Sequence, residues 1–197
     1  MQDEVKSVKS GKYTLVARIY QGKYHGFLWH DGKVIEVDLA DSLDDAWTKV
    51  CSRLYSHLSQ DADARKDLLP NASEAKQAFL NIEPRLSVGQ KAMLRKHANA
   101  KGRCLTATQL ATAAGYKAFS AANLHYGLVG AMLYGEMPRP LPMRADGSPV
   151  MTYMIADGLD QGEKSEGEWI WKMRDDIADG LTAAGIVGRS RGKGPAT

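Results

Sequence analysis

Cysteine is scarce in this sequence, which limits the classes of protein to which the chain can belong. Only two cysteines occur among 197 residues, Cys51 and Cys104, and they lie far apart inside helical patterns. This argues against a disulfide framework, and we expect both to be reduced, packed thiols of a cytoplasmic protein. Neither cysteine has a second cysteine or a histidine at metal-ligand spacing, so no metal site is expected.

Long apolar runs are missing too. No apolar stretch approaches the roughly 18 residues that a membrane-spanning helix requires. Residues 1–13, MQDEVKSVKSGKY, are polar and charged, and they lack the apolar core of a secretory signal. With 44% hydrophobic and 25% charged residues, the composition is that of an ordinary globular protein, for which we expect no membrane partner.

Sequence motifs of established catalytic chemistry are absent as well. The five histidines are scattered, and no H-E-x-x-H, G-x-S-x-G, Walker or G-x-G-x-x-G pattern occurs. Glu36 and Asp38 share one face of a predicted strand and could bind Mg²⁺, but no lysine follows at the spacing of a nuclease site. We therefore predict no enzyme, no catalytic residue and no cofactor. The alternative is a nuclease accessory subunit whose catalytic partner is a separate chain.

Negative charge is missing from the centre of the chain. Residues 84–135 contain seven Lys or Arg and no Asp or Glu, although the whole chain carries a net charge of only +3. Residues 1–83 hold 11 basic and 13 acidic side chains, and residues 136–197 hold eight and ten. A solvated surface normally carries both signs, so we expect the central span to face a polyanion. For any single cation, a merely solvated position stays the alternative.

The first 60 residues predict a small α+β unit of the order β-β-β-α. Three stretches rich in β-branched and aromatic residues predict strands, at 12–20, 24–30 and 33–38. Asp31-Gly32 between the last two is a strong hairpin signal. Ser42 is expected to cap the helix that follows, whose apolar residues recur at helical spacing. Residues 61–71 are the predicted linker.

Residues 72–187 predict a basic, mainly helical domain, so the whole chain belongs to the α+β class. Capping boxes at Ser87-x-x-Gln90 and Thr106-x-x-Gln109 open two helices, and Ser120 is expected to cap a third. The third helix is predicted to bury a stripe of Ala121, Leu124, Leu128 and Met132. Residues 150–156 and 168–173 are predicted strands that form a hairpin, and a helix is expected to begin at Asp175. Residues 188–197 predict a flexible basic tail.

This order, helix, helix, turn, helix and hairpin, is that of a helix-turn-helix or winged-helix-like domain, in which the amino end of one helix enters the major groove. Cations suit phosphates, and an asparagine amide can bond an adenine edge. For Ser120 and Asn123 the alternative is helix capping alone. The acidic loop 157–167 argues against a basic wing. The candidate nucleic-acid-binding residues are Lys91, Arg95, Lys96, Lys101, Arg103, Lys117, Ser120 and Asn123.

The stretch 105–130 contains the patterns L-T-A-x-Q-L-A, A-x-G-Y and A-A-N-L-x-Y-G, and residues 168–174 read E-W-x-W-x-M-R. Residues 85–187 thereby resemble a helix-turn-helix or winged-helix-like module of bacterial modification-dependent restriction proteins, which is often fused to HNH endonuclease domains. The resemblance implies a DNA-associated module. Its most characteristic positions are Asn123 and Tyr126, which adds Tyr126 to the candidate binding residues. No HNH nuclease follows here, so the resemblance implies recognition or regulation rather than cleavage.

The sequence as a whole predicts a non-catalytic nucleic-acid-binding protein linked to restriction, to phage–host conflict or to their regulation. Duplex DNA is the expected partner and RNA the alternative. The alternative function is that of a protein inhibitor or interaction protein that targets a bacterial defence or nucleoprotein complex. The first unit is expected to form a homodimer, or to bind a partner protein or a modified base.

Overall fold

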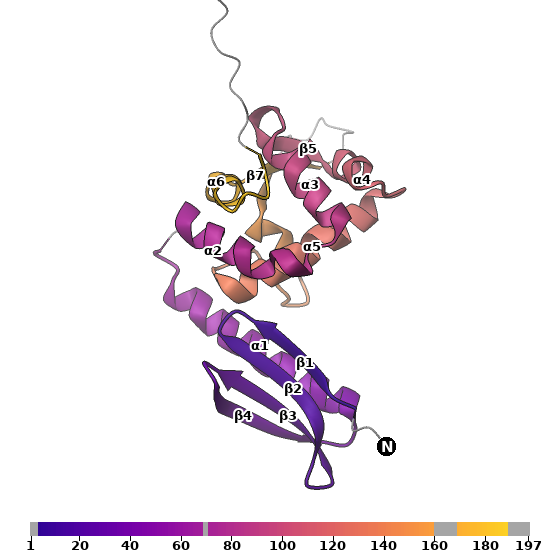
Figure 1. The fold of residues 1–197 in the computed structure, drawn as a ribbon, viewed down its shortest axis with the longest axis vertical. Coiled ribbons are helices and arrows are strands. Elements are labelled where there is room, and N and C mark those ends of the chain that lie inside the picture. Colours follow the sequence, from indigo (N-terminus) through magenta and orange to yellow (C-terminus); the bar gives the residue numbers. More distant parts are fainter. Residues whose placement is uncertain (1–3, 69–70, 160–168, 189–197) are drawn as a thin grey trace, which may run out of the picture. The chain divides into compact units, whose positions relative to one another are not determined.

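The computed structural model describes residues 4–68, 71–159 and 169–188, and the chain divides into two compact units. The first unit contains residues 1–69 and 134–140, and the second contains residues 70–133 and 141–197. Figure 1 shows the helices and strands of each unit. None of the helices in the described residues has the length and apolar character needed to cross a membrane.

The first unit contains a four-stranded antiparallel sheet whose order follows the chain. Asp31 and Gly32 have φ of 46° and 80°, so the predicted turn closes a hairpin in which His30 pairs with Lys33. A β-bulge lies between Leu28 and Trp29 and moves Val34 to the position opposite Trp29. The strands are β1 (Lys6–Ser10), β2 (Tyr13–Tyr20), β3 (Lys23–His30) and β4 (Lys33–Ala40).

The sequence predicted three strands here, and β1 is the strand that it missed. All five residues of β1 pair with β2, from Lys6 opposite Ala17 to Ser10 opposite Tyr13. The segment KSVKS has one apolar residue, Val8, so it shows no alternation that would predict a strand. It forms at an edge of the sheet, where backbone pairing rather than side-chain burial stabilises it. The unit is therefore β-β-β-β-α.

One helix, α1 (Leu43–Ala64), covers one face of this sheet (Figure 1). Ser42 caps it as predicted, since its hydroxyl accepts a hydrogen bond from the Asp45 N–H at 3.1 Å. The buried side of α1 consists of Ala46, Val50, Leu54, Leu58 and Ala62. The helix extends four residues into the predicted linker 61–71, of which residues 69 and 70 lie outside the described part of the chain.

The carboxyl end of α5 (Phe119–Glu136) also belongs to the first unit. The Tyr134 hydroxyl donates to the Leu58 carbonyl at 3.4 Å, and the Gly11 N–H donates to Glu136 Oε1 at 3.2 Å. A Cβ atom on Gly11 would lie only 1.9 Å from the Gly135 carbonyl oxygen, so the close approach of the two backbones requires glycine at position 11. Residues 134–140 thus complete a unit that is otherwise formed by the start of the chain.

The second unit is mainly helical and carries a small sheet. Its helices are α2 (Ala72–Ile82), α3 (Val88–Ala98), α4 (Ala107–Ala114), most of α5, and α6 (Asp175–Ala183). Its antiparallel strands lie in the order β5-β7-β6 and are β5 (Cys104–Thr106), β6 (Ala156–Leu159) and β7 (Ile170–Met173). Short 3-10 turns are η1 (Glu83–Arg85), η2 (Lys101–Arg103) and η3 (Met151–Met154).

The two predicted capping boxes are confirmed, and the predicted hairpin is confirmed with a shifted first strand. In each box the side chains of the first and fourth residues bond the other's backbone N–H, at Ser87 with Gln90 and at Thr106 with Gln109. Of the stretch 150–156 predicted as a strand, Met151–Met154 forms η3, and β6 begins only at Ala156. Residues 160–167 of the acidic loop and 189–197 of the tail lie outside the described residues.

The buried stripe predicted for α5 is wrong, because the buried side chains lie one or two positions further along the helix. Leu124 and Leu128 are 62% and 47% exposed, and the side chains that α5 buries are Ala122, Tyr126, Val129 and Leu133. Both sets are spaced three or four residues apart. Because α5 has no charged residue before Glu136, no hydrophilic face indicates which of the two stripes is buried.

Candidate nucleic-acid interface

A pocket of about 500 Å³ lies beside the amino-terminal turns of α5 in the second unit. Two of its walls come from α5 and from the central strand β7, and the turn η3 contributes a third. Its lining is mostly aromatic and apolar: Ala107, Phe119, Asn123, Val150, Tyr153, Trp169 and Trp171. Such a lining with few polar groups is the usual chemistry of a site that accepts a flat organic group.

The aromatic wall of the pocket is built on the sheet. Trp171 lies in β7, opposite Leu105 of β5 on one side and Gly158 of β6 on the other. The Tyr153 ring meets the Trp171 ring edge to face, with centroids 5.6 Å apart, and the Trp169 and Trp171 centroids are 6.2 Å apart. Strand residues two apart project on one side, which brings both tryptophans into the same wall.

A glycine makes room for Trp169. A Cβ atom on Gly158 would lie 2.5 Å from Cζ2 and Nε1 of the Trp169 indole, so the ring lies directly against the β6 backbone. Trp169 is nevertheless 52% exposed. Phe119, on the wall that α5 forms, is 58% exposed. Two exposed aromatic rings thus face the pocket, backed by Trp171 and Tyr153.

Asn123 supplies the amide of the pocket. The helix begins at Phe119, so Asn123 lies in its second turn and does not cap it. Its side chain is exposed, and no hydrogen bond ties its amide to another described residue. The amide is therefore available to a ligand as both donor and acceptor. Ser120 is exposed as well, one position inside the helix rather than at the cap position predicted for it.

Three of the predicted cationic residues bond to other groups within the second unit. Arg103 bonds Asp175 Oδ1 at 2.8 Å and Asp179 Oδ1 at 3.2 Å, two carboxylates of α6. Lys91 pairs with Glu83 Oε1 at 3.0 Å, and Arg95 Nε donates to the Ile186 carbonyl at 2.8 Å. The carboxylates absent from the central span are thus supplied by neighbouring parts of the chain.

The other predicted cations are exposed. Lys96 lies on α3, Lys101 begins the turn η2, and Lys117 stands two residues before α5. None of the three has an ion-pair partner among the described residues. Their predicted role in phosphate binding stays a prediction.

Tyr126 is in the core and is not a surface contact. It is 1% exposed, and its hydroxyl lies 2.7 Å from Nδ1 of the buried His97. His97 Nε2 lies 2.9 Å from the Trp171 carbonyl. A carbonyl can only accept, so Nε2 donates, and Nδ1 of the neutral ring accepts from Tyr126. This chain of bonds joins α5, α3 and β7, and it holds the strand that carries Trp171.

The environment of His97 makes the stability of the fold depend on pH. Burial lowers the pKa of His97, although the bond to the Trp171 carbonyl opposes this effect. Below a pH of about 6.5, His97 takes up a proton more readily in the unfolded chain than in the folded protein, because its pKa is lower in the folded protein. We therefore expect the melting temperature to fall as pH drops from 7 through 6.5 and to stop falling below the folded pKa. Thermal unfolding of His97→Gln at each pH checks this, since that variant should lack the slope; an equal slope in both proteins would contradict it.

No cluster of three or more His, Cys, Asp or Glu residues able to hold a metal ion occurs in residues 4–68, 71–159 and 169–188. Cys51 and Cys104 are free and half-buried, and burial raises the pKa of the Cys51 thiol. The predictions of no metal site, no catalytic residue and no cofactor remain predictions.

Comparison of the chain with family models, with curated proteins and with solved structures found no match.

The aromatic residues of the pocket were not among the predicted site residues. The pattern E-W-x-W contained the signal, since alternate residues of a strand share a face and two tryptophans there make an aromatic surface. Phe119 and Tyr153 belong to no pattern in the sequence. Only the fold brings them to the same pocket as Asn123.

Proposed function

We propose that this chain is a non-catalytic nucleic-acid-binding protein, with duplex DNA as its expected partner and RNA as the alternative. The observation that carries the proposal is the aromatic pocket at the amino end of α5, with the free amide of Asn123 in its lining and Lys117 just before the helix. Aromatic rings stack on bases, an asparagine amide pairs with a base edge, and lysines contact phosphates.

A winged-helix-like arrangement of the second unit is part of this proposal. Two observations support it: the element order α3, β5, α4, α5, β6, β7 and the sheet order β5-β7-β6. In such an arrangement α5 is the helix that approaches the major groove with its amino end. The exposed side chains there include Ser120 and Asn123.

The pocket favours a base that has left the stack. A volume of about 500 Å³ is ample for a nucleobase, and the exposed rings of Phe119 and Trp169 offer stacking surfaces. The amide of Asn123 can both donate to and accept from the edge of such a base. The resemblance to modification-dependent restriction proteins predicts that the setting is restriction or phage–host conflict, and this stays a prediction.

Binding of short labelled duplexes, with and without an unpaired base, tests the proposal. Asn123→Ala should relax discrimination between bases by about 1–3 kcal/mol without changing the melting temperature. Trp169→Ala should weaken binding by about 1–3 kcal/mol. Joint replacement of Lys96, Lys101 and Lys117 by Ala should reduce the slope of log affinity against log salt by up to about 3.

Lys76→Ala is the matched control, because Lys76 is an exposed lysine on α2, outside the proposed surface. It should leave affinity almost unchanged. Lys91, Arg95 and Arg103 are poor test positions, because their bonds to Glu83, Ile186 and α6 make their loss a change in stability. Absence of binding to any DNA or RNA at low salt would reject the proposal.

A second candidate function, that of a protein inhibitor or interaction protein, is favoured by the exposed side chains of Leu124 and Leu128 on α5. Exposed leucines one helical turn apart make an apolar ridge that suits a protein partner better than a phosphate backbone. Leu124→Asp with Leu128→Asp separates the candidates. If the pocket is the nucleic-acid site, this double variant should still bind nucleic acid. If Leu124 and Leu128 bind a protein partner, the double variant should lose the protein complex.

A further inference from the structure

The sheet of the first unit has one face that no other described element of that unit covers. Tyr13, Leu15 and Ala17 of β2 are buried on the side of α1, so the alternate residues of the strand point to the opposite side. The pairing register extends this open face across the sheet. It comprises Ser7 and Lys9 of β1, Thr14, Val16, Arg18 and Tyr20 of β2, Lys23, His25, Phe27 and Trp29 of β3, and Val34, Val37 and Leu39 of β4.

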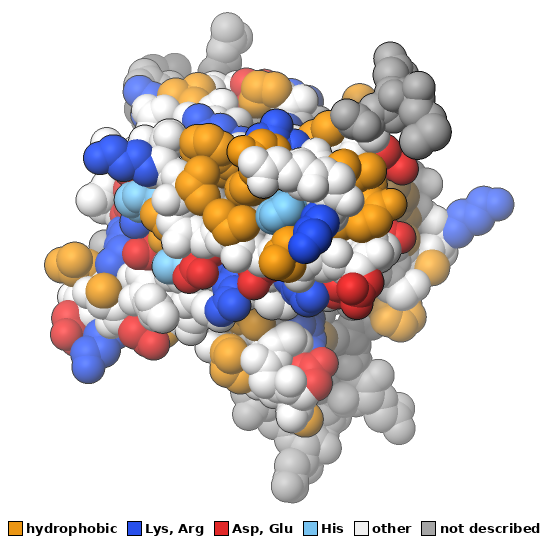
Figure 2. All heavy atoms as spheres, turned by 90° about the horizontal axis from the view of Figure 1, so that it is seen from below, with side chains coloured by type: hydrophobic (Ala, Val, Ile, Leu, Met, Phe, Trp, Pro, Cys, Tyr) orange, Lys and Arg blue, Asp and Glu red, His pale blue; other side chains and the backbone are white. Residues whose placement is uncertain are grey.

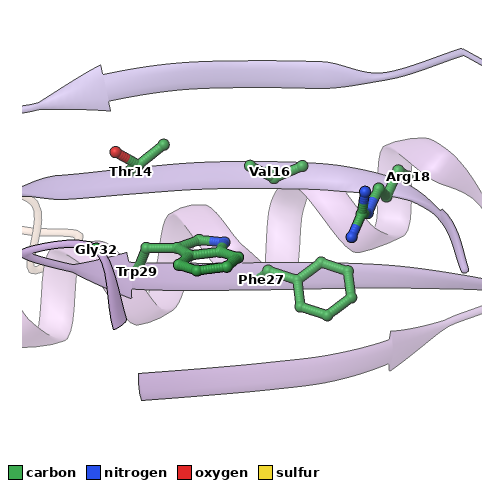
Figure 3. A pocket seen from close by; sticks show the side chains of 6 residues that line it. All are labelled: Thr14, Val16, Arg18, Phe27, Trp29 and Gly32. Atoms are coloured by element: carbon green, nitrogen blue, oxygen red, sulfur yellow. The ribbon is translucent and has the colours of Figure 1, made fainter. Parts of the chain in front are cut away.

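Aromatic rings and one guanidinium group are packed together on the open face. The Arg18 guanidinium lies 5.2 Å from the Phe27 ring centroid and 5.6 Å from that of Tyr20. The His25 ring stacks on Phe27, with centroids 5.6 Å apart and planes 17° apart. Figure 3 shows Arg18 beside Phe27, with Trp29 next along the same strand and on the same side of the sheet.

The open face is also hollowed and apolar at its margin. A pocket of about 250 Å³ lies over the middle strands and is lined by Thr14, Val16, Arg18, Phe27, Trp29 and Gly32 (Figure 3). Val37 and Leu39 of β4 are 51% and 58% exposed. The space-filling view of Figure 2 shows one end of the molecule, where hydrophobic side chains gather into a patch with histidine, Lys or Arg, and Asp or Glu side chains around it. An exposed apolar patch of this kind marks a surface that binds a partner.

The charge on the two faces of the sheet is segregated. The charged side chains of the open face are Lys9, Arg18 and Lys23, all cationic. The two strand carboxylates, Glu36 and Asp38, lie on the face of α1, because they pair across the sheet with Leu28 and Gly26. There Asp38 bonds Arg53 at 3.1 and 3.2 Å.

Glu36, the other carboxylate on the face of α1, has its Oε1 atom 3.5 Å from His57 Nε2. Residues 1–83 as a whole are acidic, with 11 basic and 13 acidic side chains, so a face of the sheet without carboxylates is not a consequence of composition. A cationic face of this kind is complementary to a polyanion.

We propose that the open face of the first unit binds single-stranded nucleic acid. Unstacked bases lie on the rings of Tyr20 and Trp29, and the sugar–phosphate backbone follows the cations Lys9, Arg18 and Lys23. Aromatic rings that stack on bases, together with cations that follow the backbone, are the general chemistry of single-strand binding. A duplex offers no unstacked ring to these side chains. The surface is separate in sequence and in unit from the pocket of Asn123, so it stands without the function proposed for that pocket.

Fluorescence anisotropy with a labelled oligothymidylate of about 12 nucleotides, at low salt and with the full chain, tests the inference. Arg18→Glu with Lys23→Glu should weaken binding at least tenfold, because two of the three cations that meet phosphate are reversed in charge. Tyr20→Leu keeps an apolar side chain but removes the ring, and it should weaken binding about fivefold or more. Circular dichroism checks that each variant keeps its fold.

Lys66→Glu is the control for charge reversal, because Lys66 is exposed beyond the end of α1 and belongs to no strand of the sheet. It should bind as the unaltered chain does. Absence of oligothymidylate binding, or binding unaffected by Arg18→Glu with Lys23→Glu, would overturn the inference. So would a duplex that binds this face as tightly as the single strand, or a dimer that Val37→Asp dissociates, since a second copy would then occupy the face.

The pocket variants distinguish this inference from the proposed function. If Asn123→Ala and Trp169→Ala leave every binding measurement unchanged while the Arg18 and Lys23 variant loses the oligonucleotide, the proposed function fails and this inference stands. The converse result, in which only the pocket variants matter, overturns the inference alone.

Discussion

Gly130→Ala should lower the free energy of unfolding by about 1–3 kcal/mol. Gly130 lies on the buried side of α5, where a Cβ atom would stand 2.0 Å from the Met151 carbonyl oxygen and 2.7 Å from its carbonyl carbon. Backbone atoms cannot rotate away, so α5 and the η3 turn must separate to admit one methyl group. Urea unfolding followed by circular dichroism measures the change.

Gly127→Ala, three residues earlier on the same helix, is the matched control. No atom lies within 4 Å of the Cβ that it would add, so the substitution brings only the higher helix propensity of alanine. It should raise the free energy of unfolding by up to about 1 kcal/mol. If Gly130→Ala and Gly127→Ala changed the free energy of unfolding in the same direction, α5 would not pack on the Met151 backbone as described.

Tyr126→Phe is expected to lower the free energy of unfolding by about 1–3 kcal/mol, although it removes a single oxygen atom. The Tyr126 hydroxyl donates to His97 Nδ1, and both side chains are buried, so the substitution leaves a polar nitrogen without a partner or water. Burial also raises the pKa of Tyr126 and so keeps the phenol protonated, which the donated bond requires.

Tyr55→Phe provides the comparison, since Tyr55 is 50% exposed on α1 and water can replace any partner of its hydroxyl. It should change stability by less than about 0.5 kcal/mol. The two variants are to be unfolded under the same conditions. An equal, small effect of both would mean that the bond between Tyr126 and His97 contributes nothing to the fold.

Tyr126→Phe also bears on the pocket. The chain of bonds from Tyr126 through His97 ends on the carbonyl of Trp171, whose ring forms the back of the aromatic wall. The buried position of Tyr126 is therefore explained by what its hydroxyl group holds in place. Tyr126 positions a strand, and Asn123 on the exposed side of the same helix meets the solvent.

Local signals in the sequence predicted the local structure well. Both capping boxes, the Ser42 cap and the Asp31-Gly32 turn depend on residues within four positions of one another, so neighbours in the chain determine them. β5 lacks such a signal. Its three residues pair with β7, which lies more than sixty positions further along, and they run directly into the capping box of α4.

The sequence predicted the candidate site less well, because it gives the order of charges along the chain and not their positions in space. The span without carboxylates is real, but Asp175 and Asp179 of α6 come back to Arg103 and neutralise it. Similarly, four aromatic residues scattered between Phe119 and Trp171 meet only because η3 and β7 lie beside α5. Distances of this kind depend on tertiary packing, which no local pattern encodes.

The split composition of the first unit has a consequence for the order in which the chain assembles during its synthesis. The bond from Gly11 to Glu136 joins residues 125 positions apart, and Tyr134 closes onto α1 in the same region. At about 5–20 residues per second, several seconds separate the synthesis of α1 from that of residues 134–140. During this interval the sheet lacks its contacts with residues 134–140, while the ribosome synthesises helices of the second unit. Its first-made strand is among the last parts of the unit to be completed.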